Sequence, residues 1–124
     1  MARFVNLTNH PSAKWSAPQR DAALALASEL VDLPFPEVPV DAGESWLRAT
    51  AMALAERVAP GDTACVQGEF TLAFLVVAEL QRKDVACVAA ATVRDVVEGQ
   101  DDKGATMKTT RFVFRRFREY PRAG

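Results

Sequence analysis

Residues 63–91 have the sequence TACVQGEFTLAFLVVAELQRKDVACVAAA. The β-rich run Thr63–Val66 predicts a strand, Gln67–Glu69 breaks it, and Phe70–Arg82 predicts an almost wholly apolar helix. Val85–Ala91 is then a continuous apolar run, typical of a strand whose two sheet faces are both covered by helices. This strand–helix–strand unit predicts a parallel sheet in an α/β domain.

Two further strand–helix units are predicted upstream. Phe4–Thr8 alternates like a short strand, and residues 16–19 (Ser-Ala-Pro-Gln) have the form of a capping box with proline in the first helical turn. Glu29–Leu33 predicts the next strand, which the proline-rich loop 34–39 ends. A second helix is predicted from about Glu44 to Val58.

The pattern changes after residue 91. Arg94–Glu98 and Thr106–Arg118 predict two strands around a turn at Gln100–Gly104, and therefore an antiparallel hairpin. The fold class is thus predicted as a single three-layer α/β domain, residues 1–124, with a mainly parallel sheet and a C-terminal antiparallel hairpin. Ligands of such sheets bind outside the carboxyl ends of the strands. Four loops are predicted at that edge: Asn9–Trp15, Pro34–Asp41, Gln67–Glu69 and Thr92–Arg94.

Composition narrows the class of protein. The chain has 124 residues, of which 49% are apolar and 25% charged, which excludes disordered, coiled-coil and fibrous proteins. Cys65 and Cys87 lack C-x-x-C spacing and lie in apolar runs, so they are predicted to be reduced core residues. The opening residues do not form a signal peptide, and no apolar stretch is long enough to span a bilayer. We expect a cytoplasmic protein with no membrane partner.

Charge is unevenly distributed. Residues 1–102 carry eight Lys and Arg against fifteen Asp and Glu, a net −7, whereas residues 103–124 carry seven against one, a net +6. The basic tail suggests an anionic partner, or simply an edge strand protected by charge against aggregation; both interpretations stay open. Strict alternation places tail side chains on two faces. These are Phe112, Phe114 and Arg116 on one face, and Arg111, Val113, Arg115 and Phe117 on the other.

The first loop is the richest candidate site. It holds the sole histidine, His10, with Asn9, Ser12, Lys14 and Trp15, directly before a predicted helix N-terminus. Such a terminus presents unpaired N–H groups that suit phosphate or carboxylate, and His, Ser and Lys can donate to an anion or move a proton. The structural alternative is a turn formed by Asn9 and Ser12, with Trp15 packed against the helix start.

The second candidate site is the Gln67–Glu69 loop with Thr71. Gly68 allows a ligand to approach the backbone where a strand turns into a helix, although Glu69 could equally be a helix cap. The loop matches neither the G-x-G-x-x-G fingerprint nor the P-loop, and no G-x-S-x-G elbow is present. One histidine and two core cysteines supply no metal-ligand set, so neither a metal nor a cofactor is predicted.

Four sequence blocks carry a family resemblance. They are Asn9–Ser12 with Trp15, Asp32–Pro36, Val66–Leu72 and Arg116–Tyr120. In these blocks, over nearly its whole length, the chain resembles small single-domain proteins of type III CRISPR systems, which are compact relatives of CARF (CRISPR-associated Rossmann-fold) domains. The resemblance implies a Rossmann-like homodimer that binds a cyclic oligoadenylate second messenger across its two-fold axis. Some such proteins are metal-independent ring nucleases.

The resemblance also implies roles for residues. In ring nucleases the ribose 2′-hydroxyl of the ligand attacks the adjacent phosphate and leaves a 2′,3′-cyclic phosphate end, so His10, Ser12 and Lys14 become the catalytic candidates. A polymeric nucleic acid is not the expected partner. Two alternatives remain: a non-catalytic sensor or sponge for the same messenger, and an interaction module that uses the basic tail to bind protein or nucleic acid. The candidate ligand-binding residues are Asn9, Trp15, Gln67, Gly68, Glu69, Thr71 and Arg94.

The helix Phe70–Leu80 is the predicted dimer contact. It offers more apolar surface than one sheet face can cover, so part of it is predicted to stay exposed and to form the two-fold contact. The alternative is burial of the whole helix between the sheet and the terminal hairpin.

Overall fold

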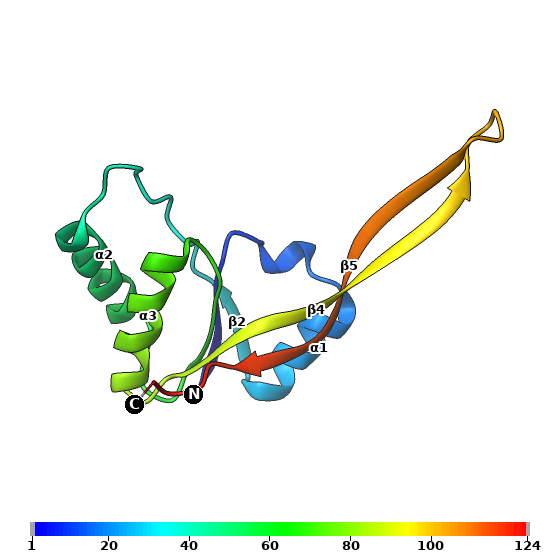
Figure 1. Ribbon diagram of the computed structural model, residues 1–124. Helices are drawn as coiled ribbons and strands as arrows, with labels where there is room; N and C mark the ends of the chain where they lie inside the picture. Colours follow the sequence, from blue (N-terminus) through cyan, green and yellow to red (C-terminus); the bar gives the residue numbers. More distant parts are fainter. Residues whose placement is uncertain (1, 124) are drawn as a thin grey trace.

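A computed structural model describes residues 2–123 and shows one five-stranded sheet (Figure 1). Its strands are β1 (Arg3–Leu7), β2 (Glu29–Asp32), β3 (Thr63–Val66), β4 (Ala86–Gln100) and β5 (Thr106–Glu119). The strand order is β2-β1-β3-β4-β5, with β1 to β4 parallel and β5 antiparallel to β4. The mixed α/β class, the mainly parallel sheet and the C-terminal antiparallel pair are therefore confirmed.

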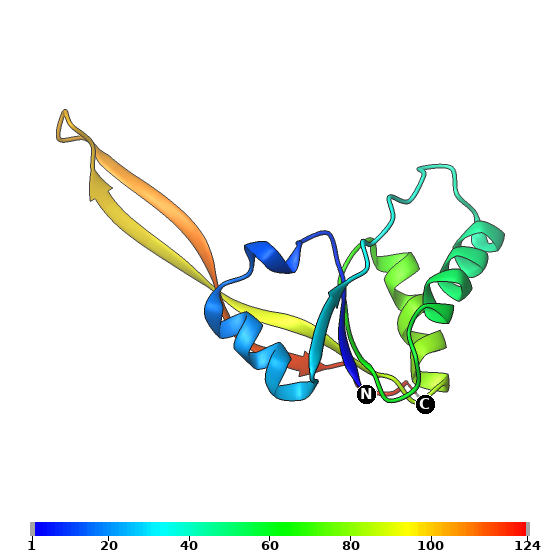
Figure 2. The same cartoon turned by 180° about the vertical axis from the view of Figure 1, so that it is seen from behind.

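The helices lie on both sides of this sheet (Figures 1 and 2). They are the short 3₁₀ helix η1 (Ser12–Lys14), α1 (Ala17–Leu26), α2 (Glu44–Glu56) and α3 (Phe70–Arg82). α2 and α3 pack together over one face of the sheet, and α1 covers the other face beside β5. Among residues 2–123, no helix is both long and apolar enough to cross a membrane.

Strand alternation divides the core into two layers. On β1, Val5 packs into the layer under α2 and α3, whereas Phe4 packs into the layer under α1. Cys87 lies in the first layer and Cys65 in the second, and both are free thiols. Burial raises the pKa of Cys65 to about 12 and that of Cys87 to about 11. Both cysteines are thus buried core residues with free thiols, as predicted, and their raised pKa values disfavour the reactive thiolate.

Side-chain caps fix the starts of two helices. Ser16 Oγ accepts a hydrogen bond from the Gln19 N–H at the start of α1, which confirms the predicted cap. Glu69 caps α3, since its carboxylate accepts from the Thr71 N–H at 2.6 Å and from the Thr71 hydroxyl. Hydrogen bonds from the Thr71 side chain and backbone lower the pKa of Glu69 below its ordinary value.

The C-terminal strands differ from the prediction. The sequence predicts strands at Val85–Ala91 and Arg94–Glu98, with a loop at Thr92–Arg94 on the ligand-binding edge of the sheet. That division is wrong, because β4 runs unbroken from Ala86 to Gln100. β5 pairs with it from Val88↔Glu119 to Gln100↔Thr106. Nothing in the β-branched segment between the two expected strands disfavours extended backbone.

A β-bulge in β5 changes which aromatic residues share a face. Ala91 pairs with Arg116 but Thr92 pairs with Phe114, so Arg115 is an extra residue. Phe117 consequently lies on the same side as Phe114, with ring centroids 4.9 Å apart. Its expected position on the opposite face is wrong, since alternation holds only for an uninterrupted strand.

Beyond the bulge, β4 and β5 project from the body as a two-stranded arm, residues 92–114 (Figures 1 and 2). A compact turn closes its tip: Asp101 Oδ1 accepts from the N–H groups of Lys103 and Ala105, and Gly104 adopts a φ of +79°. Most side chains of the arm are exposed. The exposed large apolar ones are Val93, Val96, Val97, Met107 and Phe112.

Candidate functional site

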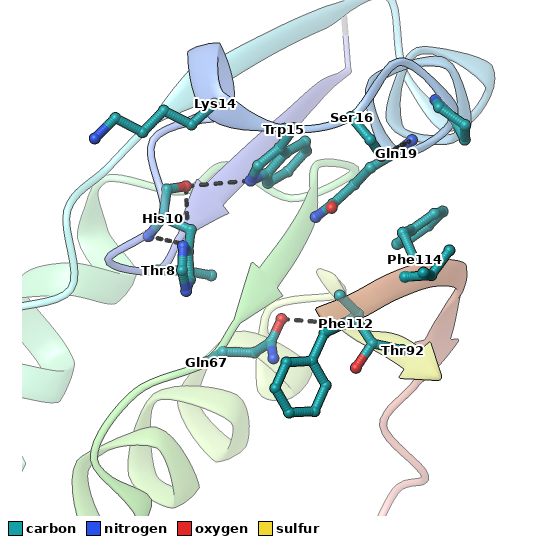
Figure 3. Close-up of a pocket in the computed structure, with 13 residues that line it drawn as sticks. Thr8, His10, Lys14, Trp15, Ser16, Gln19, Gln67, Thr92, Phe112 and Phe114 are labelled. Carbon is teal, nitrogen blue, oxygen red and sulfur yellow. Dashed lines mark hydrogen bonds between the residues drawn. The ribbon is translucent and has the colours of Figure 1, made fainter. Parts of the chain in front are cut away.

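A pocket of about 640 Å³ opens at the carboxyl ends of β1 and β3, between the η1–α1 segment and the base of the arm (Figure 3). Its volume is typical of small-molecule sites, which span roughly 300–1,000 Å³. The edge of the sheet is the one where the parallel topology predicts a ligand. The lining residues are Thr8, His10, Lys14, Trp15, Ser16, Pro18, Gln19, Gln67, Ala90, Thr92, Phe112, Val113 and Phe114.

A buried polar network holds the first loop in place. Asn6 lies in β1 and is fully buried; its Nδ2 donates to the His10 carbonyl at 2.7 Å and to Asp32 Oδ1 at 3.1 Å. Thr8 Oγ1 donates to Asn6 Oδ1 at 2.7 Å, and the Ser12 N–H donates to Asp32. Sequence reasoning missed Asn6, although a polar residue within an apolar strand was a usable signal.

Trp15 packs against the core and also lines the pocket. Its Nε1 donates to the His10 carbonyl at 3.2 Å, and its ring packs edge-on against Phe4 and near Phe117, with centroids 6.1 and 5.9 Å away. The exposed side of the same ring lines the pocket beside His10. Trp15 therefore anchors the loop and also offers an aromatic surface to a ligand.

Gln67 has a fixed orientation. Its Oε1 accepts from the Ala90 N–H at 3.0 Å (Figure 3). The same oxygen accepts from Cys65 Sγ at 3.4 Å. With the oxygen occupied in this way, Nε2 is the group left to a ligand, and it can only donate. A ligand that contacts Nε2 must therefore offer a hydrogen-bond acceptor.

The remaining residues of the Gln67–Glu69 candidate have structural roles. Glu69 and Thr71 form the α3 cap and do not line the pocket. A Cβ at Gly68 would collide with the Phe35 ring, so the glycine is required by packing. Of the two interpretations of Glu69, the structure shows the cap.

Three further candidates lie outside the pocket lining. Asn9 is exposed, and Ser12 uses its backbone to hold the loop, with the carbonyl accepting from Arg20 at 2.6 Å. Arg94 lies in the arm, exposed and opposite Phe112. Of the predicted site residues, the pocket brings together His10, Lys14, Trp15 and Gln67.

Several lining residues were not assigned to a site from the sequence. Ser16 and Gln19 were recognised only as a helix cap, and Phe112 and Phe114 only as part of the basic tail. Their place in the pocket depends on the β4–β5 register, which brings the base of the arm to the first loop. Only the mixture of aromatic and polar residues in the tail hinted at a site.

The chemistry of the lining favours an anionic or acceptor-rich ligand with planar groups. The lining includes the His10 imidazole, the Lys14 ammonium and the Gln67 amide, and no Asp or Glu. Lys14 extends outward at the rim in Figure 3, while Phe112 and Phe114 lie across the pocket from Trp15. Within residues 2–123, no group of three His, Cys, Asp or Glu side chains is placed to hold a metal ion.

A protein-family model, Uncharacterized protein MJ1673 family, matches residues 2–118. The chain belongs to the MJ1673 family. Among residues 2–123, every residue that lines the pocket falls in the matched region, as does the whole arm. No curated protein and no solved structure gives a significant match. The resemblance to CARF-related proteins stays a prediction.

Proposed function

We propose that this MJ1673-family protein is a Rossmann-like, CARF-related homodimer that binds a cyclic oligoadenylate in the pocket and cleaves it as a metal-independent ring nuclease. It would act in the cytoplasm, in type III CRISPR antiviral signalling. One observation carries the proposal: the pocket combines the hydrogen-bond donors of His10, Lys14 and Gln67 with aromatic rings at the carboxyl edge of the sheet.

The lining suits a nucleotide in two respects. Adenine can stack on Phe112, Phe114 or Trp15, and a base–aromatic stack contributes about 1–3 kcal/mol. A phosphate or a ring nitrogen can accept from Gln67 Nε2, whose orientation is set before the ligand arrives. Preorganised donors lower the entropic cost of binding.

The cleavage needs only a proton transfer and charge stabilisation. The ligand's 2′-oxygen loses its proton to a base and forms a bond to the adjacent phosphorus; the P–O5′ bond breaks, and the departing O5′ takes up a proton. The His10 imidazole can accept or deliver that proton, and Lys14 can rotate inward to stabilise the extra negative charge. Because Ser12 does not line the pocket, His10 and Lys14 carry the chemistry in this proposal.

The exposed side of α3 is the surface on which the sequence places the two-fold contact of the proposed dimer; the open edge of β4 is the competing surface. Phe70 and Phe74 are 89% and 69% exposed, whereas Leu72, Val76 and Leu80 are buried. Part of the helix is exposed, as predicted, and the alternative of whole-helix burial under the hairpin is wrong, since the arm projects away from α3 (Figure 1). A two-fold arrangement of pockets would match a ring of repeating nucleotides.

The decisive experiment is incubation of purified protein with cyclic oligoadenylates of several ring sizes in excess EDTA, followed by chromatography. We expect linear products that end in a 2′,3′-cyclic phosphate. Intact rings of every size would refute the enzymatic proposal.

A binding-only protein is the second candidate. The observation that favours it is that no carboxylate among residues 2–123 lines the pocket, since a catalytic imidazole is usually oriented by such a group. Saturable binding of a cyclic oligoadenylate in a calorimeter, with the ring recovered intact, would assign the protein as a sensor or sponge.

A further inference from the structure

One edge of β4 has no strand beside it over most of its length. β3 pairs with β4 only from Ala86 to Val88, whereas β5 covers the opposite edge as far as Gln100. Within residues 2–123, no other strand pairs with the edge beyond Val88. A long open edge of this kind is a template for another strand.

Two hydrogen bonds define which backbone groups face the open edge. The Tyr120 N–H donates to the Cys87 carbonyl, so odd-numbered residues of β4 point toward β5. The Ala90 N–H donates away from β5, to Gln67 Oε1. Backbone groups alternate along a strand, so those of the following even-numbered residues also face outward. These residues are Thr92, Arg94, Val96, Glu98 and Gln100.

This edge is complementary to itself. In an antiparallel pairing centred on Val96, Arg94 lies opposite Glu98 of the partner subunit, and the same charge pair forms again on the other side of the axis. Thr92 lies opposite Gln100 of the partner subunit. We propose that two copies of the chain pair through this edge, and not through α3, with Val96 on the two-fold axis, and form a continuous β5-β4-β4-β5 sheet.

The composition of the arm favours a second copy over nucleic acid. Residues 92–114 carry equal numbers of Lys plus Arg and Asp plus Glu, four of which are joined in two cross-strand pairs, Asp95–Arg111 and Glu98–Lys108. A neutral arm with exposed Val96 and Val97 offers little attraction to phosphates. A two-stranded hairpin is marginally stable by itself, and pairing makes it half of a four-stranded sheet.

The pairing has a consequence for the pocket. Thr92 lines the pocket, so Gln100 of the partner subunit and the turn that follows it would lie at the pocket rim. The ladder ends there because Gln67 already occupies the Ala90 N–H. Each pocket would thus be completed by the tip of the partner's arm, whichever ligand it takes; the inference rests on strand geometry and not on the proposed function.

Charge reversal tests the register. In light scattering at micromolar concentration the wild-type chain should be a dimer, and Arg94→Glu should raise its dissociation constant by at least roughly tenfold by opposing Glu98 of the partner subunit. Adding Glu98→Arg to Arg94→Glu should restore the dimer. Arg115→Glu is the matched control, because it makes the same charge change on β5 and should leave the dimer intact.

Cross-linking tests the axis independently of affinity. Val96→Cys should form an intermolecular disulfide on mild oxidation, because a hydrogen-bonded antiparallel pair places opposed Cα atoms about 5.5 Å apart, within the range that a disulfide spans. Thr110→Cys, directly across from Val96 within the arm, should remain reduced. The native thiols are buried and should not compete.

Four results would overturn the proposal. They are a monomeric wild-type chain, an Arg94→Glu variant that dimerises normally, a charge swap that does not restore the dimer, and equal cross-linking of the two cysteine variants. Dissociation by Phe74→Glu but not by Arg94→Glu would overturn it as well, by placing the contact on α3.

Discussion

The body and the arm are made partly from the same two strands, yet they are stabilised differently. Val88 and Val96 both lie in β4, but Val88 is 6% exposed and packs under α1, whereas Val96 is 49% exposed. The body gains free energy by burying apolar surface on both sheet faces. The arm has its ladder, its tip turn and cross-strand pairs, and little buried surface. The comparison shows that backbone pairing can carry two strands well beyond the region where the helices of the same chain bury the faces of the sheet.

The largest expected effect is on the free energy of unfolding. Phe4 is fully buried against Trp15 and Phe117, so Phe4→Ala should cost about 3–5 kcal/mol. Phe112 is 71% exposed, so Phe112→Ala should change stability by less than about 0.5 kcal/mol. Urea unfolding followed by circular dichroism measures both. Equal losses would break the distinction between body and arm.

The next largest effects are on ligand cleavage and ligand binding, and they should differ between pocket residues of the body and pocket residues of the arm. His10 belongs to the body and is the proposed proton-transfer group, so His10→Ala should slow ring cleavage by about 100-fold. Phe112 belongs to the arm and offers a stacking surface, so Phe112→Ala should raise the Kd by roughly tenfold while the single-turnover rate at saturation stays unchanged. Single-turnover kinetics separates the two effects. A rate unchanged by His10→Ala would leave His10 with a binding or structural role.

A pH dependence should arise in the body. Burial by itself raises the pKa of Asp62, but hydrogen bonds from the Arg3 and Ala59 N–H groups and the Arg3 guanidinium outweigh it and hold the pKa below the ordinary value. A depressed folded-state pKa contributes stability above the unfolded value, about 3.9, and loses it as pH falls through the folded value.

The urea midpoint should therefore drop below about pH 4, and Asp62→Asn should remove part of that drop and cost about 2 kcal/mol at neutral pH. Glu44→Gln, which breaks the exposed pair with Arg48, is the control and should cost less than about 0.5 kcal/mol. An unchanged acid profile in Asp62→Asn would contradict the assignment.

The smallest effect concerns the contact between body and arm base. Gln67→Leu should weaken nucleotide binding by about tenfold, because the variant loses the Nε2 donor and leaves the Ala90 N–H without its acceptor. Gln81→Leu also removes an amide hydrogen bond, to the Tyr120 carbonyl, but away from the pocket. Calorimetry should show unchanged affinity for Gln81→Leu. Equal affinities in both variants would show that Gln67 has only a structural role, through its hydrogen bond to β4, and does not bind the ligand.

Much of the fold could be predicted from local signals. The Ser16 cap, the turn after Gln100 and the alternation of strand and helix up to residue 91 each depend on a few neighbouring residues. The burial of both cysteines followed from the apolar runs around them. Such features do not depend on the tertiary arrangement of the chain, because the hydrogen bonds and the hydrophobic periodicity that define them involve residues within one helical turn or one strand.

The pocket could be predicted only in part. The sequence indicated His10, Lys14 and Trp15 because they are close together in one loop, and it indicated Gln67 because two parallel strands end at the same sheet edge. It did not indicate Asn6 as the residue that pins the loop.

Tertiary structure alone decided the remainder. The bulge at Arg115 reverses the alternation of β5, so it places Phe117 on the same side as Phe114. Phe112 reaches the pocket only through that register, about a hundred residues after His10. The physical reason is that side-chain direction in a strand has a period of two, so one extra residue moves every later side chain to the other face. The position of the extra residue, Arg115, is determined by the pairing of β5 with β4 and not by its neighbours in the sequence.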